Sequence, residues 1–227
     1  MKEDILFKLK ELALDSGQTA HTYEFKNEMP KANNGVGLKK WLTNEIEEIN
    51  DCINALESKH GLQSVCKKGC SDCCKQFIVL TQPECVAIEA YINNLDYETR
   101  EYLKKKTQET SLLLEENEIN MSLVNNLNPR NYSFTFQKSI QERYFNLNIP
   151  CIFLNEKNEC LIHPVRPSLC WSYREYYDSY KCKSCFSDTG FKYDDWEAKS
   201  TQRLFSARPF HTGLLIMPYA IKKIMHW

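Results

Sequence analysis

The chain has 227 residues, of which 42% are hydrophobic and 12% aromatic, enough to bury a core without disulfide bonds. Its 29 basic and 30 acidic residues leave a net charge of −1, so the composition gives no electrostatic footprint for nucleic acid or an anionic membrane. Eleven cysteines are an odd number, which excludes complete pairing within the chain.

The charge pattern of the first residues bears on where the protein works. These residues are charged throughout and lack the apolar stretch of a secretory signal. No apolar run approaches the roughly 20 residues that a membrane span needs. We therefore expect a cytoplasmic protein with no membrane partner and no clear nucleic-acid partner, while a protein partner or a protein substrate remains open. In that compartment thiols stay reduced, and clustered cysteines serve metal or redox chemistry.

The first half of the chain predicts a succession of helices. Residues 1–36 predict a weakly amphipathic helix and a polar connection, an N-terminal helical extension to a single domain over residues 37–227. From Leu38 to Leu56, apolar residues recur at helical spacing, which predicts a helix with one buried face.

Two helix starts can be located by their capping residues. Thr81 and Glu84 have the spacing of a capping box, which predicts a helix immediately after Thr81. Asp96 can cap a second helix that runs from Tyr97 to about Asn117.

The second half gives weaker signals. Residues 118–131 are rich in asparagine and predict a loop. Residues 132–147 begin with an alternation typical of a strand and continue with helical spacing, and we interpret them as a helix. Two short apolar runs, 149–154 and 160–162, are separated by five polar residues and predict a β-hairpin. Pro167 can open a short helix.

The last residues show helical periodicity only over 214–225. The expected fold class is mainly α with a small β-hairpin and an irregular cysteine-rich metal-binding region.

The first group of cysteines lies within nine residues. Cys66, Cys70, Cys73 and Cys74 would share one face of a continuous helix. Alternatively, they would line a tight turn that Gly69 permits, with backbone N–H groups directed at the thiolates. Both conformations bring the thiols together, and such spacing is typical of metal sites.

A second group of cysteines follows far along the chain. Cys151 and Cys160 would lie on the two arms of the hairpin, and Cys170 at the start of the next helix, where a thiolate is stabilised. Cys182 and Cys185 form a further pair at knuckle spacing.

Other candidate ligands are interpreted as structural. Cys52 and Cys85 lie on predicted helices and are expected to pack as small apolar side chains. His163 precedes a proline at the end of a predicted strand, and we interpret it as a surface or packing residue rather than a ligand.

The cysteine spacing over about residues 62–186 resembles the YkgJ-type cysteine-cluster family, a CxxCxxCC domain described as chelating zinc or iron. The shared features include the doubled cysteine, an apolar segment after it, Glu84 and Arg166-Pro167-x-x-Cys170. Two features depart from the pattern: the first gap is three residues where many relatives have two, and Trp171 stands where arginine is usual. Part of the pattern is also similar to flagellin lysine N-methylases.

The resemblance implies eight metal-binding cysteines, seven of which map directly, with Cys182 or Cys185 as the eighth. Eight thiolates are twice what one tetrahedral zinc needs, so two zinc sites, a bridged pair or an iron–sulfur cluster with spare ligands remain open. The candidate metal ligands are Cys66, Cys70, Cys73, Cys74, Cys151, Cys160, Cys170, Cys182 and Cys185.

The predicted function is a metal-binding protein that holds zinc, iron or an iron–sulfur centre through a two-part cysteine cluster. The alternative is a cluster-dependent enzyme, either similar to protein lysine N-methylases or a redox enzyme. The sequence contains no nucleotide-binding fingerprint or nucleophile elbow, and no catalytic residue is assigned.

Overall fold

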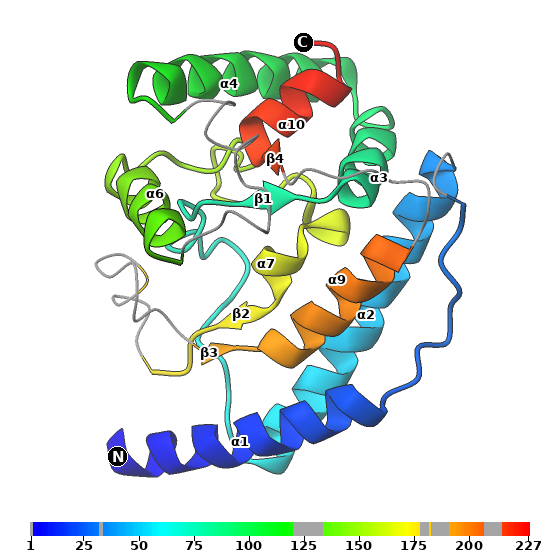
Figure 1. The fold of residues 1–227 in the computed structure, drawn as a ribbon, viewed down its shortest axis with the longest axis vertical. Coiled ribbons are helices and arrows are strands. Elements are labelled where there is room, and N and C mark those ends of the chain that lie inside the picture. The colour runs from blue at the N-terminus through cyan, green and yellow to red at the C-terminus, as the bar shows by residue number, and fades with distance from the viewer. Residues whose placement is uncertain (1, 32–33, 120–133, 178–181, 183–190, 207–214) are drawn as a thin grey trace.

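The computed structural model describes residues 2–31, 34–119, 134–177, 182, 191–206 and 215–227 (Figure 1). These residues contain eight α-helices and four two-residue strands, which confirms the mainly α fold class. The helices are α1 (Lys2–Thr22), α2 (Gly35–Lys59), α3 (Gln82–Ile92), α4 (Tyr97–Glu116), α6 (Phe134–Asn146), α7 (Ser168–Trp171), α9 (Asp194–Ser206) and α10 (Met217–Ile224).

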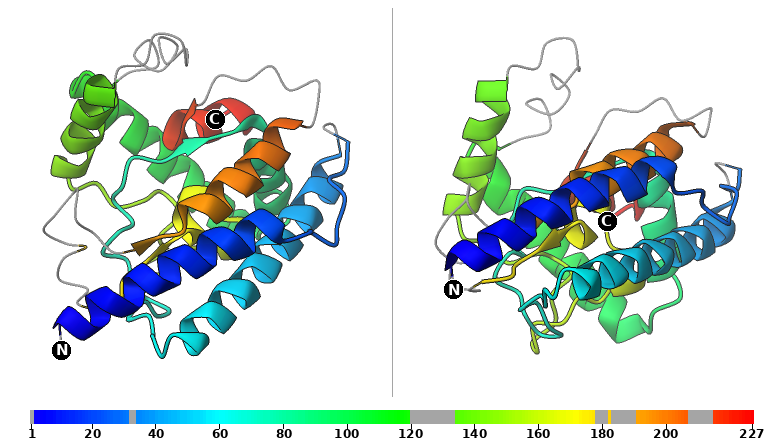
Figure 2. Two further views of the ribbon diagram at one scale, coloured as in Figure 1. Left: turned by 60° about the horizontal axis from the view of Figure 1, so that its bottom comes forward. Right: turned by 90° about the horizontal axis from the view of Figure 1, so that it is seen from below.

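The helix predicted from Leu38 onward is α2, and it forms the centre of the fold. Its apolar face is buried: Leu38, Trp41, Leu42, Ile46, Ile49, Ile53 and Leu56. The helix packs most extensively against α3 and also contacts α1, which lies against both α2 and α9 (Figure 2). No helix in the described ranges is both long enough and apolar enough to cross a membrane.

Both predicted helix starts are confirmed. Thr81 Oγ1 accepts a hydrogen bond from the Glu84 N–H, and the Glu84 carboxylate accepts one from the Thr81 N–H, which completes the capping box of α3. Asp96 caps α4 by accepting from the N–H of Thr99.

The later helices agree with the sequence in part. Helix α6 lies within the predicted stretch 132–147 and α10 within 214–225, whereas most of the predicted loop 118–131 lies outside the described residues. Helix α9 was not predicted. Its buried side includes Trp196, Ser200 and Leu204, and the serine in the middle interrupts the apolar pattern.

The predicted hairpin is reduced to a chain reversal. A single antiparallel bridge joins Leu154 and Cys160, and the side chain of Asn155 accepts hydrogen bonds from the N–H groups of Lys157 and Glu159. The turn therefore forms as expected, but its arms do not continue as a ladder.

The strands instead pair residues that are distant in sequence. Strand β1 (Val79–Leu80) pairs antiparallel with β4 (Leu215–Ile216), with Val79 opposite Ile216. Strand β2 (Tyr173–Arg174) pairs antiparallel with β3 (Phe191–Lys192), with Tyr173 opposite Lys192. Each sheet has two strands.

The buried apolar residues form two clusters. The larger one surrounds α2, α3 and α9 and includes Leu12 and Ala20 of α1. The expected boundary between an N-terminal extension, residues 1–36, and a domain, residues 37–227, stays a prediction. The smaller one joins α4, α6 and α10. The chain that carries Cys151 runs from Ile149 in the smaller cluster to Ile152 in the larger one, so this cysteine lies where the two clusters meet.

Candidate metal centre

The first cysteine group adopts the turn conformation and not the continuous helix. The N–H of Cys70 donates to the carbonyl of Lys67 at 2.9 Å, and the N–H of Cys74 donates to the carbonyl of Ser71 at 2.9 Å. Gly69 has φ of +84°, a left-handed conformation that glycine adopts without strain. Two successive turns therefore place the four thiols.

The second cysteine group lies against the first. The N–H of Cys151 donates to the carbonyl of Cys74 at 2.7 Å, and the N–H of Glu175 donates to Sγ of Cys66 at 3.4 Å. An ion pair between Lys68 and Glu159 adds a third link at 3.2 Å. We call residues 64–75 and 151–175, together with Cys182, the cysteine region.

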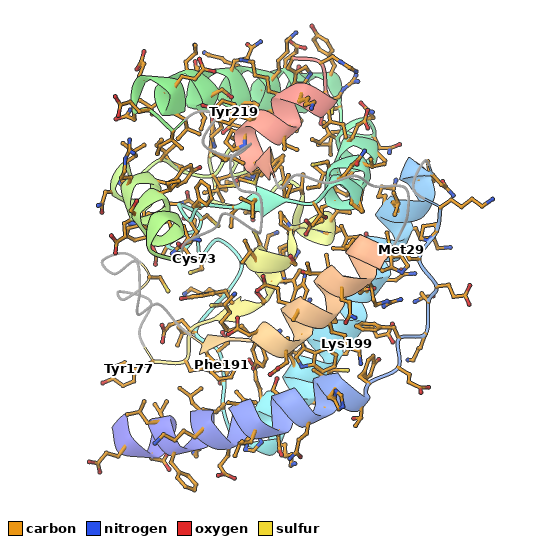
Figure 3. All side chains as sticks on the ribbon, viewed as in Figure 1. Met29, Cys73, Tyr177, Phe191, Lys199 and Tyr219 are labelled. Carbon is orange, nitrogen blue, oxygen red and sulfur yellow. The ribbon has the colours of Figure 1, made fainter. Side chains whose placement is uncertain are left out.

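The thiols of this region influence one another electrostatically. Burial raises the pKa of Cys70, Cys151, Cys170 and Cys182, and the charge of Cys73 adds to each of these shifts. A hydrogen bond with Cys74, followed by burial, raises the pKa of Cys73 itself. Figure 3 labels Cys73 on the side of the molecule that carries α6.

The two remaining thiols belong to the same network. After burial, the charge of Cys160 contributes to the raised pKa of Cys151 and of Cys170. Cys66 acts in the same direction on the pKa of Cys70 and of Cys182. Eight predicted ligands are thus linked electrostatically, whereas Cys185 lies outside the described residues.

Backbone N–H groups favour the thiolate form of several of these cysteines. Burial raises the pKa of Cys70, and the N–H of Asp72, two residues further along, acts in the opposite direction. The N–H of Phe153 does the same for Cys151, and that of Ile162 does so for Cys160. Such donors stabilise a thiolate when a cation is bound to it.

The cysteines interpreted as packing residues lie elsewhere. Cys85 is buried in the larger apolar cluster, where burial raises its pKa to about 12. Cys52 packs against the same cluster beside Tyr23. Neither Cys52 nor Cys85 is among the groups whose charge shifts the pKa of the thiols in the cysteine region.

Arg166 and His163 lie at the edge of the thiols. The guanidinium of Arg166 contacts the ring Nε2 of His163, and its own Nε is buried without a hydrogen-bond partner among the described residues. Burial lowers the pKa of Arg166, while the charges of Cys170 and Cys160 act to raise it. Arg166 is therefore placed to offset negative charge on these two thiols.

A buried glutamate connects the cysteine region to the helical part of the molecule. Besides its capping box, Glu84 accepts a hydrogen bond from the N–H of Ser168 at 2.9 Å through Oε1. Ser168 is the first residue of α7, which carries Cys170. The sequence predicted the cap of α3 but not this second contact, because the partner lies 84 residues away.

Glu175 is a polar residue of the site that the sequence analysis missed. Its side chain is buried, its N–H donates to Cys66, and its charge contributes to the raised pKa of Cys182 after burial and Cys73. The sequence could have indicated its burial in one way only: Glu175 is a single acidic residue within the aromatic stretch from Tyr173 to Tyr177.

The described cysteines are all free thiols. Within the described ranges, no group of three or more Cys, His, Asp or Glu side chains is close enough to hold a metal ion. Burial raises the pKa of these thiols, and the backbone N–H groups and Arg166 act in the opposite direction without cancelling the shift. The donors fit zinc or iron in chemical type, but metal binding would have to release protons and draw the turns together.

Comparison of the chain with protein-family models, with curated proteins and with solved structures gave no match. The resemblance to the YkgJ-type family therefore depends on the spacing of the cysteines in this sequence alone.

Proposed function

We propose that the chain is a metal-binding protein that holds zinc, iron or an iron–sulfur centre through cysteines from both parts of the cysteine region. The observation that carries this proposal is that eight thiols, four from residues 66–74 and four from Cys151 onward, lie close enough for the charge of some to shift the pKa of others.

Three physical features support the proposal. A backbone hydrogen bond from Cys151 to Cys74, and one from the N–H of Glu175 to Sγ of Cys66, hold the two segments together. Backbone N–H groups face three of the thiols and favour their ionised form. Cys66 is also exposed, so without a metal its thiol would be accessible to oxidants.

In this proposal the ligands are Cys66, Cys70, Cys73, Cys74, Cys151, Cys160, Cys170 and Cys182, with Cys185 as a candidate outside the described residues. Zinc would cross-link the turns and stabilise the fold. An iron–sulfur cluster would add electron transfer or cluster-dependent chemistry. Arg166 would offset part of the negative charge that the thiolates bring.

The experiment that tests the proposal is metal analysis together with an ultraviolet–visible spectrum of protein purified without oxygen. A colourless protein with one or two zinc ions per chain supports a structural or Lewis-acid site. A brown protein with iron and acid-labile sulfide supports a cluster and directs attention to methyl-transfer or redox chemistry. Reduced protein that binds neither metal, even after reconstitution, contradicts the proposal.

A further inference from the structure

Four glutamates are buried in the described part of the chain, and they allow an internal comparison. The exposed fractions are 2% for Glu45, 7% for Glu57, 1% for Glu84 and 5% for Glu175. A buried carboxylate without partners is costly, so each oxygen should accept a hydrogen bond or face a cation.

Three of the four carboxylates have partners for both oxygens. Glu45 accepts from Ser200 through Oε1 at 2.7 Å and from Arg203 through Oε2 at 2.6 Å. Glu57 accepts from the hydroxyl of Tyr176 and from Arg174, the latter at 2.8 Å.

Glu84 completes this set of three. Its Oε2 accepts from Thr81, and its Oε1 accepts from the N–H of Ser168. The fold therefore satisfies a buried carboxylate wherever the described residues supply the donors.

Glu175 is the exception. Its Oε1 accepts from the N–H groups of Tyr176 and Tyr177 at 3.0 and 2.8 Å, which fixes the turn that follows β2. Its Oε2 is buried and has no hydrogen-bond partner among the described residues. The neighbouring Arg174 does not serve it, because that guanidinium binds Glu57, Asn50 and Asn54 on α2.

The unpartnered oxygen belongs to a residue bonded directly to a candidate ligand. The Glu175 N–H donates to Sγ of Cys66 at 3.4 Å, and the Glu175 carbonyl accepts from the N–H of Val65 at 2.8 Å. The charge of Glu175 also acts on Cys182, whose pKa burial raises to about 12. Glu175 thus contacts Cys66 through its N–H and acts on Cys182 through its charge, two cysteines from opposite ends of the cysteine region. Among the described residues these side chains are not close enough to hold a metal, so binding would have to draw them together.

We propose that Glu175 Oε2 is an oxygen ligand of the metal that Cys66 and Cys182 help to bind. This inference rests on the proposed function. A cation at that position would supply the missing partner of Oε2 while Oε1 keeps its two backbone donors. Carboxylate oxygen and thiolate sulfur together suit Zn²⁺, which accepts both.

A mixed set of ligands has a chemical consequence. Carboxylates bind zinc alongside thiolates, but a mixed sulfur and oxygen set differs from the closed all-cysteine set of structural sites. The site at this end of the cysteine region would therefore differ from one built of four thiolates, and its metal would be more readily exchanged.

The test compares wild-type protein with Glu175→Gln. The reduced, metal-free chain of 227 residues is titrated with Co²⁺, which is then displaced with Zn²⁺. Glutamine keeps an oxygen for the N–H groups of Tyr176 and Tyr177, but its amide nitrogen cannot bind a metal. We expect the affinity for Zn²⁺ to fall at least about tenfold, because even the loss of a group that only supports a metal ligand reduces metal affinity by about that factor. The visible bands of bound Co²⁺ should shift because one oxygen ligand is gone.

Glu57→Gln is the matched control, since it alters a buried glutamate that contacts the same aromatic stretch but has partners for both oxygens. It should change the stability of the fold and leave the Co²⁺ spectrum unchanged. A Glu175→Gln protein with wild-type affinity and spectrum overturns the inference and assigns Glu175 to the turn alone. A wild-type chain that binds neither ion overturns the inference as well. Only a chain that also takes up no iron on reconstitution contradicts the proposed function itself, so the two failures are distinguishable.

Discussion

The helical body around α2, α3 and α9 and the cysteine region bury charge in different ways. In the helical body, Glu45 receives a serine hydroxyl and an arginine from α9, so the chain itself completes the interaction. In the cysteine region, Glu175 Oε2 and Arg166 Nε are buried without partners among the described residues, beside thiols whose pKa values burial raises. The buried carboxylate of Glu45 is therefore complete as it stands, whereas that of Glu175 leaves one oxygen to which our proposal assigns a bound cation.

The largest expected effect comes from breaking the cysteine region at Cys73. Cys73→Ser should release metal and lower the free energy of unfolding by about 4 kcal/mol or more, as loss of a metal does. Urea unfolding with and without a chelator, together with metal analysis, measures this. The difference from wild type should disappear once both proteins are metal-free.

Cys52→Ser is the control for that experiment, because Cys52 packs against the larger apolar cluster and lies outside the thiol network. It should retain the wild-type metal content. If Cys73→Ser also retains its metal and its melting temperature, Cys73 is not a ligand.

A cavity in the helical body should act independently of metal. Ile53 is fully buried on α2, so Ile53→Ala should cost about 2–5 kcal/mol both in the presence and in the absence of a chelator. Leu112→Ala, at a residue that is 56% exposed, should change the stability by no more than about 0.5 kcal/mol. A cost for Ile53→Ala that appears only in the metal-loaded protein would show that the two regions are not separable.

Glu84 joins the two regions, so its substitution should affect both. Glu84→Ala leaves buried donors of Thr81 and Ser168 without an acceptor and should cost about 2–3 kcal/mol. It should also weaken metal binding, because α7 carries Cys170. Unfolding and Zn²⁺ titration measure the two effects.

Asp96→Ala is the matched control for Glu84→Ala. Asp96 caps α4 in an exposed position, so its loss should cost about 1 kcal/mol and leave metal affinity unchanged. Equal metal affinities for the two variants would mean that Glu84 does not position Cys170.

The smallest effect is a pH dependence within the helical body. Burial raises the pKa of Glu45 from 4.5 to about 7, although Ser200 and Arg203 act in the opposite direction. Because the folded state binds this proton more tightly, the contribution is fully present below pH 4.5 and is lost as the pH rises to about 7. Within that window stability should fall by about 1 kcal/mol per pH unit.

The measurement is urea unfolding of metal-free protein at several pH values, with Glu45→Gln for comparison. Glutamine does not titrate, so the variant should lack this slope. A wild-type slope equal to that of Glu45→Gln would show that Glu45 stays ionised throughout, held by Arg203.

The sequence by itself determined the helices whose signals are local. The buried stripe from Leu38 to Leu56 and the caps at Thr81 and Asp96 depend on residues within a few positions of one another, as helical hydrogen bonds do. The candidate ligands also follow from a local signal, the spacing of the cysteines along the chain.

Only the tertiary structure decided the rest, because the partners are distant in sequence. The apolar pattern of α9 is interrupted by Ser200, and only Glu45 on α2 explains why a serine is buried there. The strand pair β2–β3 and the contact between Glu84 and Ser168 likewise depend on long-range neighbours. The bond from Cys151 to Cys74 and the unpartnered oxygen of Glu175 follow from the way residues 151–175 lie against the first cysteine group, which no local pattern specifies.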